Sequence, residues 1–332
     1  MHCTEPMTTF STDPGRLVSR TTAASPRIAV LVPCYNEEAT VERVVREFRA
    51  ALPQAVVYVY DNNSKDKTFK LAVEAGAVTR MERRQGKGNV VRRMFADIEA
   101  DAYVLVDGDS TYHAPSAPQM VNLLFQDSLD MVVGCRAHTE VEAYRPGHQF
   151  GNAMLTGFVA RLFGRSFTDI LSGYRVFSRR FVKSFPALAV GFETETELTV
   201  HALELRMPVS EVNTPYGARP EGSSSKLSTY RDGFRILGLI LALYKHERPL
   251  QFLSIVAGML ALLSLLLATP LLVEFAQTGL VPRFPTAILA TGIMILAALS
   301  FTIGLVLDTV TRGRKEFKRL TYLQISRYEP PA

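Results

Sequence analysis

Two aspartates, Asp107 and Asp109, stand one residue apart directly after the apolar run 102–106. Such a run is typical of a buried strand of a parallel sheet, so both carboxylates would project from its carboxyl end, where open α/β sheets bind ligands. Hard oxygen ligands suit Mg²⁺ or Mn²⁺, ions that commonly lie between carboxylates and substrate phosphates. The pair therefore indicates a metal-bound diphosphate, with a strand-ending turn of solvated aspartates as the alternative.

Two earlier apolar runs also end in acidic residues. Residues 28–32 lead into a loop that contains Glu37, and residues 56–60 end at Asp61. Between them, apolar side chains recur at spacings of three and four, which predicts a helix packed on the sheet: Val41, Val44, Val45, Phe48 and Leu52. A crevice lined this way fits a nucleotide base and ribose on one side and a metal-bound diphosphate on the other.

Four ordered motifs lie in this region: the loop 33–38, the turn 61–64, the aspartate pair at 107–109 and the turn 172–175. Together they resemble glycosyltransferase family 2, and within it the polyprenyl-phosphate branch of dolichyl-phosphate mannose synthases and undecaprenyl-phosphate sugar transferases. The resemblance covers roughly residues 27 to 235. It implies an α/β GT-A fold with a Rossmann-like, mostly parallel sheet, a UDP- or GDP-linked sugar donor, Mg²⁺ or Mn²⁺, and a lipid-phosphate acceptor.

The resemblance also implies which residues bind the donor. It assigns the base and ribose to Pro33, Tyr35 and Glu37, with Asp61 hydrogen-bonding the base, although Tyr35 could be a loop-packing aromatic. The donor set is completed by neighbours in the same motifs and by the residue that opens the next helix: Asn36, Asn63, Asp107 and Lys87. Lys87 lies in a Gln-Gly-Lys-Gly-Asn stretch that lacks the spacing of a Walker loop, so a solvated turn is its alternative.

The metal is assigned to Asp107 and Asp109. The mannose-synthase pattern places a Gln two residues after the second Asp, whereas this chain has Thr111. A water or the Thr111 hydroxyl would then complete the coordination shell.

Basic side chains are assigned to the acceptor, because phosphates favour arginine forks. The predicted acceptor-phosphate residues are Arg136, Arg219, Ser225 and Lys226, and the predicted catalytic residues are Asp109, Asp169 and Arg175. Each arginine could instead form a surface ion pair, and Asp169 could be a helix cap or a partner of Arg175. The resemblance adds Glu195, although three acids at a helix start are also explained by the helix dipole.

The C-terminal third has a different composition. Residues 250–273 and 284–307 carry no charge and are long enough to cross a bilayer, with a buried core hairpin as the alternative. Basic residues gather at their outer ends, which predicts by the positive-inside rule that the catalytic domain is cytoplasmic. The mixed apolar and basic segment 230–248 predicts a helix in the headgroup plane, or an ordinary packed helix, and 312–320 predicts a basic tail helix near anionic lipid.

These patterns divide the 332 residues into five segments. A disordered extension (1–26) precedes the GT-A domain (27–228), a juxtamembrane amphipathic segment (229–248), a transmembrane hairpin (249–309) and a basic cytoplasmic tail (310–332). The charge balance, 37 Lys and Arg against 32 Asp and Glu, shows no basic aromatic stripe of the kind that binds nucleic acid. Three scattered cysteines and unpaired histidines exclude a disulfide framework and a zinc hydrolase motif.

The sequence therefore predicts a metal-dependent, multi-pass inner or plasma membrane enzyme of the cell envelope. It would transfer a single sugar, with inversion, from a nucleoside-diphosphate sugar to a polyprenyl phosphate, undecaprenyl phosphate being the expected lipid, and it could form a homo-oligomer. A processive polysaccharide synthase is one alternative, although that class carries a Gln-x-x-Arg-Trp motif and this chain has no tryptophan. A catalytically silent GT-A scaffold and a nucleotidyltransferase are the others.

Overall fold

The computed structural model describes residues 25–138, 156–161, 167–188, 193–217, 238, 240–326 and 328. Three of the predicted acceptor residues, Arg219, Ser225 and Lys226, lie outside these ranges. Residues 1–24 of the predicted extension and most of 229–239 lie outside them as well.

The described part of the catalytic region forms a seven-stranded sheet in the order β3-β2-β1-β4-β6-β5-β7. Strand β6 runs antiparallel to β4 and β5, whereas the other paired strands are parallel. This confirms the predicted α/β, mostly parallel sheet. The strands are β1 (Ile28–Cys34), β2 (Ala55–Asp61), β3 (Val78–Met81), β4 (Ala102–Leu105), β5 (Met131–His138), β6 (Arg175–Ser178) and β7 (Val209–Tyr216).

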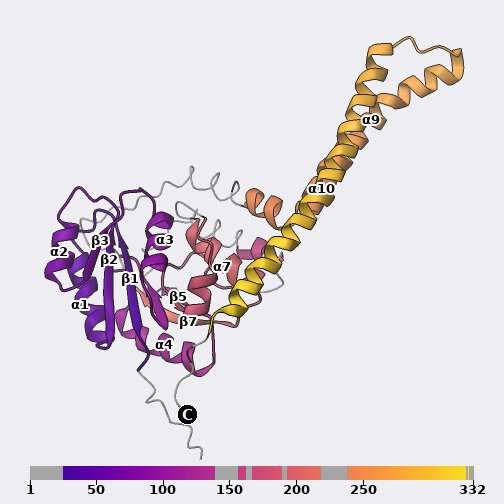
Figure 1. The fold of residues 1–332 in the computed structure, drawn as a ribbon. Coiled ribbons are helices and arrows are strands. Elements are labelled where there is room, and N and C mark those ends of the chain that lie inside the picture. The colour runs from indigo at the N-terminus through magenta and orange to yellow at the C-terminus, as the bar shows by residue number, and fades with distance from the viewer. Residues whose placement is uncertain are drawn as a thin grey trace, which may run out of the picture.

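Helices cover both faces of the sheet because the strands are apolar on both sides (Figure 1). Within β1, Ala29 and Leu31 enter one core while Val30 and Val32 enter the other, as the two-residue period of a strand requires. The first core is packed by α3 (Lys87–Asp97), α6 (Arg179–Ser184) and α7 (Thr194–Glu204), and the second by α1 (Val41–Ala51), α2 (Thr68–Glu74) and α4 (Ala117–Gln126).

Strand register brings the carboxyl ends of β1, β2 and β4 to one edge of the sheet. Cys34 at the end of β1 pairs with Asp61 at the end of β2, and Leu31 pairs with Leu105 at the end of β4. The loops that carry the predicted donor and metal residues therefore start side by side.

Two helices follow the domain, α9 (Pro249–Thr278) and α10 (Phe284–Gln324). Both are long and apolar enough to cross a membrane, as predicted. They run together away from the domain (Figure 1), with the Ser264 hydroxyl donating to the carbonyl of Ala290 at 2.7 Å and Gly304 lying against Leu250 and Leu253. Gly279 ends α9 with a φ of 69°, a left-handed conformation that suits glycine.

Helix α10 extends well past its apolar part and reaches the domain. The Lys318 ammonium donates to Glu204 of α7 at 2.7 Å, and the Tyr322 hydroxyl donates to Asp130 at 2.6 Å. The sequence placed residues 312–320 near anionic lipid, whereas the structure directs Lys318 at a carboxylate of the domain. These contacts tie the end of α10 to the domain.

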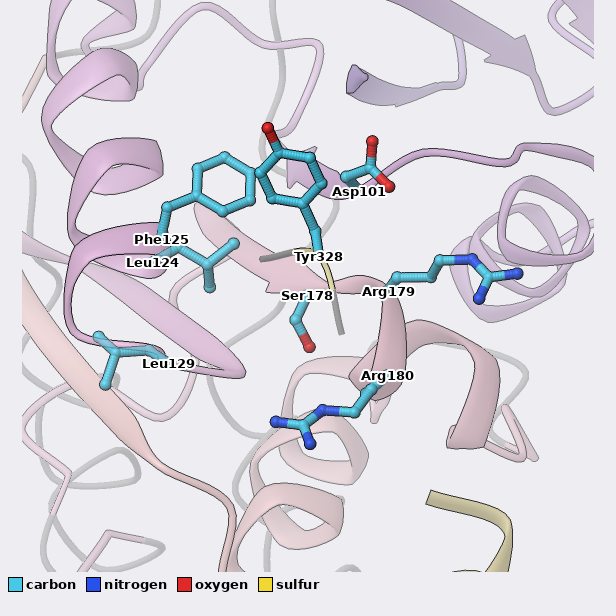
Figure 2. Close-up of a pocket in the computed structure, with 8 residues that line it drawn as sticks. All are labelled: Asp101, Leu124, Phe125, Leu129, Ser178, Arg179, Arg180 and Tyr328. Atoms are coloured by element: carbon cyan, nitrogen blue, oxygen red, sulfur yellow. The ribbon is translucent and has the colours of Figure 1, made fainter. Parts of the chain in front are cut away.

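Beyond α10, Tyr328 packs on Phe125 of α4 with ring centroids 5.2 Å apart. These rings border a cavity of about 10 Å³ that Asp101 and Arg180 also line. Figure 2 shows its lining residues. Since Asp101 immediately precedes β4, this cavity is at the end of the sheet opposite the predicted site. A volume that holds about one water cannot hold a substrate.

Candidate active site

Acidic side chains gather at the carboxyl ends of β1, β2 and β4, around the thiol of Cys34. We call Glu37, Asp61, Asp107 and Asp109 the acidic edge. Burial raises the pKa of the Cys34 thiol, and the charges of all four carboxylates raise it further. The structure thus brings together four of the predicted donor and metal residues, from three separate motifs.

Lys87, the first residue of α3, lies between two carboxylates. Its ammonium pairs with Asp107 and with Glu195 of α7, and its side chain is 13% exposed. Burial alone would lower the pKa of Lys87, but the two carboxylates outweigh that effect and raise it, so the side chain stays protonated at neutral pH. Lys87 therefore already supplies a positive charge beside one half of the aspartate pair.

Asp109 is held by Thr111. The Thr111 backbone N–H and hydroxyl both donate to Oδ1 of Asp109, at 3.2 Å and 2.6 Å. The turn around them is fixed from the start of α1, since Thr40, just before α1, donates to the carbonyl of Gly108 at 2.6 Å and Arg43 donates to the carbonyl of Ser110 at 3.1 Å. Thr111 thus orients the second aspartate in this structure.

The loops after β1 and β2 bind each other. The Asn36 N–H donates to the Ser64 hydroxyl at 2.8 Å, Asn36 accepts from the Lys65 N–H at 2.8 Å, and the Ser64 hydroxyl donates to Asp61. Asn36 and Asn63 have φ values of 51° and 64°, left-handed conformations that asparagine tolerates better than most residues. Pro33 lies within β1, directly before Cys34.

Gly173 brings the predicted turn at 172–175 against the aspartate pair. A β-carbon built on Gly173 would overlap Oδ2 of Asp107, so the backbone approaches this carboxylate as closely as a glycine permits. The Gly173 N–H donates to the Tyr112 hydroxyl at 2.8 Å, which fixes the turn. The structure thus joins two motifs that are far apart in sequence.

Arg175 is the first residue of β6 and pairs with Leu105 at the end of β4. Its side chain is fully buried, and its guanidinium donates to the carbonyls of Ser172 at 2.9 Å and Ile170 at 2.5 Å and to the Thr199 hydroxyl at 2.8 Å. Burial lowers the pKa of Arg175. In this geometry Arg175 holds the 170–175 turn in place, and its predicted catalytic role would require it to leave those carbonyls.

Arg136 and Asp169 form a bidentate ion pair, with both nitrogen–oxygen distances at 2.7 Å. Burial alone would raise the pKa of Asp169, but the hydrogen bonds and charge of Arg136 lower it. The sequence offered Arg175 as a possible partner of Asp169. That alternative is wrong, because β5 carries Arg136, which forms the ion pair with Asp169.

Asn62 is a residue that the sequence analysis missed. Its side-chain N–H groups donate to the carbonyls of Glu82 at 3.0 Å and Arg84 at 2.7 Å, and its oxygen accepts from the Gly86 N–H at 2.7 Å. These bonds fix the loop that leads into α3 and so place Lys87. The available signal was a second polar residue directly after Asp61.

The donor set of the acidic edge fits a hard divalent cation. Asp107 and Asp109 supply carboxylate oxygens alone, the ligand type that Mg²⁺ and Mn²⁺ prefer. Within the described ranges, no group of three or more His, Cys, Asp or Glu side chains is placed to hold a metal. A cation held here would therefore take its other ligands from water and substrate phosphates, as Mg²⁺ commonly does.

Comparison with known proteins agrees with this architecture. Residues 29–185 match the family model Glycosyl transferase family 2. Glycosyltransferase AglJ of Haloferax volcanii is 35% identical over 228 residues, covering 67% of this chain and 72% of AglJ. The chain belongs to glycosyl transferase family 2.

A relative named for a polyprenyl phosphate also matches this chain. An undecaprenyl-phosphate 4-deoxy-4-formamido-L-arabinose transferase of Pseudomonas aeruginosa is 24% identical over 289 residues, covering 81% of this chain and 82% of the relative. This confirms the predicted resemblance to polyprenyl-phosphate glycosyltransferases.

A solved structure confirms the GT-A-like fold. Glucosyl-3-phosphoglycerate synthase of Mycobacterium tuberculosis, crystallised with Mn²⁺, UDP-glucose and glycerol 3-phosphate, aligns with a TM-score of 0.54 at 22% identity. The alignment covers 66% of this chain and 79% of the synthase.

Proposed function

We propose that this family 2 glycosyltransferase moves one sugar from a nucleoside-diphosphate sugar to a polyprenyl phosphate, inverting the anomeric carbon. The observation that carries the proposal is the presence, in one chain, of the acidic edge and of two apolar helices, the second of which is anchored on the domain. The first fits a nucleotide diphosphate with its cation, and the second would hold the domain where a lipid acceptor is found.

On the donor side, the side chains divide the work by position. Glu37 and Asp61 would accept hydrogen bonds from the ribose and base, the role that their loops have in the resembling family. Lys87, kept protonated by Asp107 and Glu195, would contact the diphosphate. Pro33, Tyr35, Asn36 and Asn63 would shape the two loops around the nucleotide.

Asp107 and Asp109 would hold Mg²⁺ or Mn²⁺, which supplies Lewis-acid stabilisation of the leaving diphosphate when bound. The crystal structure of glucosyl-3-phosphoglycerate synthase with Mn²⁺ and UDP-glucose supports this choice of ion for the fold. Thr111 and Gly173 then act by fixing the two carboxylates, so that catalysis rests on positioning and charge.

On the acceptor side, a phosphate oxygen is already anionic and needs no general base. Arg136, Arg219, Ser225 and Lys226 remain our candidates to receive that phosphate, with Asp169 orienting Arg136 through their bidentate pair. The attacking oxygen would approach opposite the departing diphosphate, which inverts the anomeric carbon.

We also propose the five segments with the boundaries given above and a cytoplasmic catalytic domain. Basic residues flank the outer ends of the hairpin, including Arg248 before α9 and Arg314 within α10, whereas Glu274 and Arg283 pair with each other at 3.0 Å near its turn. This distribution follows the positive-inside rule.

A direct assay tests the proposal. Membranes from cells that express the chain are incubated with radiolabelled UDP- and GDP-sugars, one at a time, and matched membranes without the chain are the control. We expect one sugar to enter an organic-extractable product that mild acid releases. Label in a water-soluble polymer would instead indicate a processive synthase, and no transfer from any nucleotide sugar would indicate a silent scaffold.

A further inference from the structure

A groove of about 310 Å³ lies at the foot of α9, away from the acidic edge in sequence. It is lined by Phe158, Arg161, Tyr244, Arg248 and Gln251. None of these residues belongs to the acidic edge or to the predicted donor and acceptor sets. The volume is at the lower end of the range for small-molecule sites.

The lining combines two guanidinium groups with an aromatic wall. Arg161 is the last described residue of the helical segment 156–161, and Arg248 directly precedes α9, whose amino terminus adds the positive end of a helix dipole. The Tyr244 ring makes edge contacts with Phe158 at 6.0 Å and Phe252 at 6.1 Å between centroids. Such a site suits an anion that carries a hydrocarbon part.

The acid beside the groove is already compensated. Glu247 is buried, and its carboxylate pairs with Lys315 at 2.8 Å and Arg314 at 3.4 Å, both on α10. These two bases offset the charge of Glu247 from the side of α10.

We propose that this groove binds the headgroup phosphate of an anionic bilayer phospholipid, at a site separate from the acceptor lipid. Helix α9 begins at Pro249, and if it crosses the bilayer, the groove lies at the level where bilayer phosphates are found. The bound lipid would fix the domain at the surface through Arg161 and Arg248. The inference needs the hairpin to lie in a membrane but does not depend on sugar transfer.

Native mass spectrometry of the full chain in detergent, with an equimolar mixture of phosphatidylglycerol and phosphatidylcholine, measures this binding directly. We expect the wild type to retain phosphatidylglycerol about tenfold more than phosphatidylcholine, because the two guanidinium groups of the groove would pair with its anionic headgroup. The double variant Arg161→Gln with Arg248→Gln should lose that preference, and Arg161→Gln alone, on an exposed side chain, should lose part of it. Lys245→Gln, which removes an exposed base outside the groove lining, should keep it.

Equal retention of both lipids by the wild type, or the same loss in Lys245→Gln, would overturn the proposal, because binding would then be absent or due to general charge. Farnesyl phosphate separates the two lipid sources. If it displaces phosphatidylglycerol one for one and the double variant raises the KM for polyprenyl phosphate, the groove belongs to the acceptor and the proposal is wrong. We expect neither, and the lipid readout stands even where no sugar is transferred.

Discussion

The acidic edge and the contact between α10 and the domain use charge in opposite ways. At the acidic edge, one ammonium, that of Lys87, serves two carboxylates, and four acids surround Cys34. At the second place α10 meets both the domain and the residue pair before α9, and we call these contacts the docking seam: Lys318 pairs with Glu204 of the domain, and Glu247, just before α9, pairs with both Arg314 and Lys315. Acids are in excess at the first and bases match or exceed them at the second.

This difference in charge balance distinguishes a ligand-binding site from a structural contact. Buried ion pairs add little net stability but cost several kcal/mol when one partner is removed, so balanced pairs are typical of a structural contact. Neighbouring carboxylates at the end of a sheet repel one another when they outnumber the bases, and a bound cation reduces this repulsion. Changes at the acidic edge should therefore affect activity, and changes at the docking seam should affect stability.

The largest effect is expected from Asp109→Asn. The amide keeps an oxygen that can accept both bonds from Thr111, so the turn is preserved while the negative charge is lost. We expect sugar transfer to fall at least about a hundredfold, the scale of losing transition-state charge stabilisation, with little change in thermal midpoint. Asp127→Asn, at an exposed acid, is the control. Normal turnover by Asp109→Asn would remove the metal assignment.

Gly173→Ala tests the contact between the 172–175 turn and the aspartate pair. The added methyl group would displace the carboxylate of Asp107, so transfer should fall about tenfold to a hundredfold, as small misplacements at reacting groups do. Gly157→Ala is a matched control, since a β-carbon there meets nothing within 4 Å. Equal activity of the two variants would show that the position of Asp107 is not critical.

Lys318→Met should break the docking seam. The Glu204 side chain is 1% exposed, so loss of its partner leaves a buried carboxylate uncompensated and should lower the free energy of unfolding by about 3 kcal/mol. Lys315→Met should cost about 1 kcal/mol or less, because Arg314 still pairs with Glu247. Thermal unfolding in detergent measures both changes. Similar losses in the two variants would contradict the distinction between them.

The smallest expected effect is a pH dependence at His201, which packs against Phe181 and Phe185 near the docking seam. Burial lowers its pKa to about 3, and the charge of Lys318 adds to this. At His201 the unfolded chain binds a proton below about pH 6.5, whereas the folded chain does not until about pH 3. The free energy of unfolding therefore decreases as the pH is lowered through this window, by at most about 1.4 kcal/mol per pH unit. His201→Gln should reduce the slope of thermal midpoint against pH between 6.5 and 5, whereas exposed His113→Gln should keep it. An unchanged slope in His201→Gln would refute this origin.

The sequence predicted where the residues of the acidic edge lie because the signals for their position are local. Apolar runs mark parallel strands, and the residues directly after them, Asp61 and Asp107 among them, must meet at one edge whatever the loops do. The apolar stretches of α9 and α10 were equally readable, since hydrophobic length does not depend on distant partners.

The docking seam and the arginine contacts were not predictable in the same way. Lys318 and Glu204 are far apart in sequence, as are Arg136 and Asp169, and no periodicity reports such a pairing. Arg175 is the clearest example, because a charged residue is rarely fully buried and its carbonyl partners at 170 and 172 become visible only in three dimensions. For the same reason, the basic composition of 312–320 predicted contact with anionic lipid, because its carboxylate partner Glu204 could not be identified from the sequence.

The central claim is that the acidic edge binds a nucleoside diphosphate together with a divalent cation. Isothermal titration of the detergent-solubilised chain with UDP and with GDP, each with and without Mn²⁺, tests it most directly. We expect one of the two nucleotides to bind the wild type only when Mn²⁺ is present. For Asp109→Asn, we expect Mn²⁺ not to increase the binding of that nucleotide. Binding of neither nucleotide in the presence of Mn²⁺, or equal Mn²⁺-dependent binding by Asp109→Asn, would contradict the account.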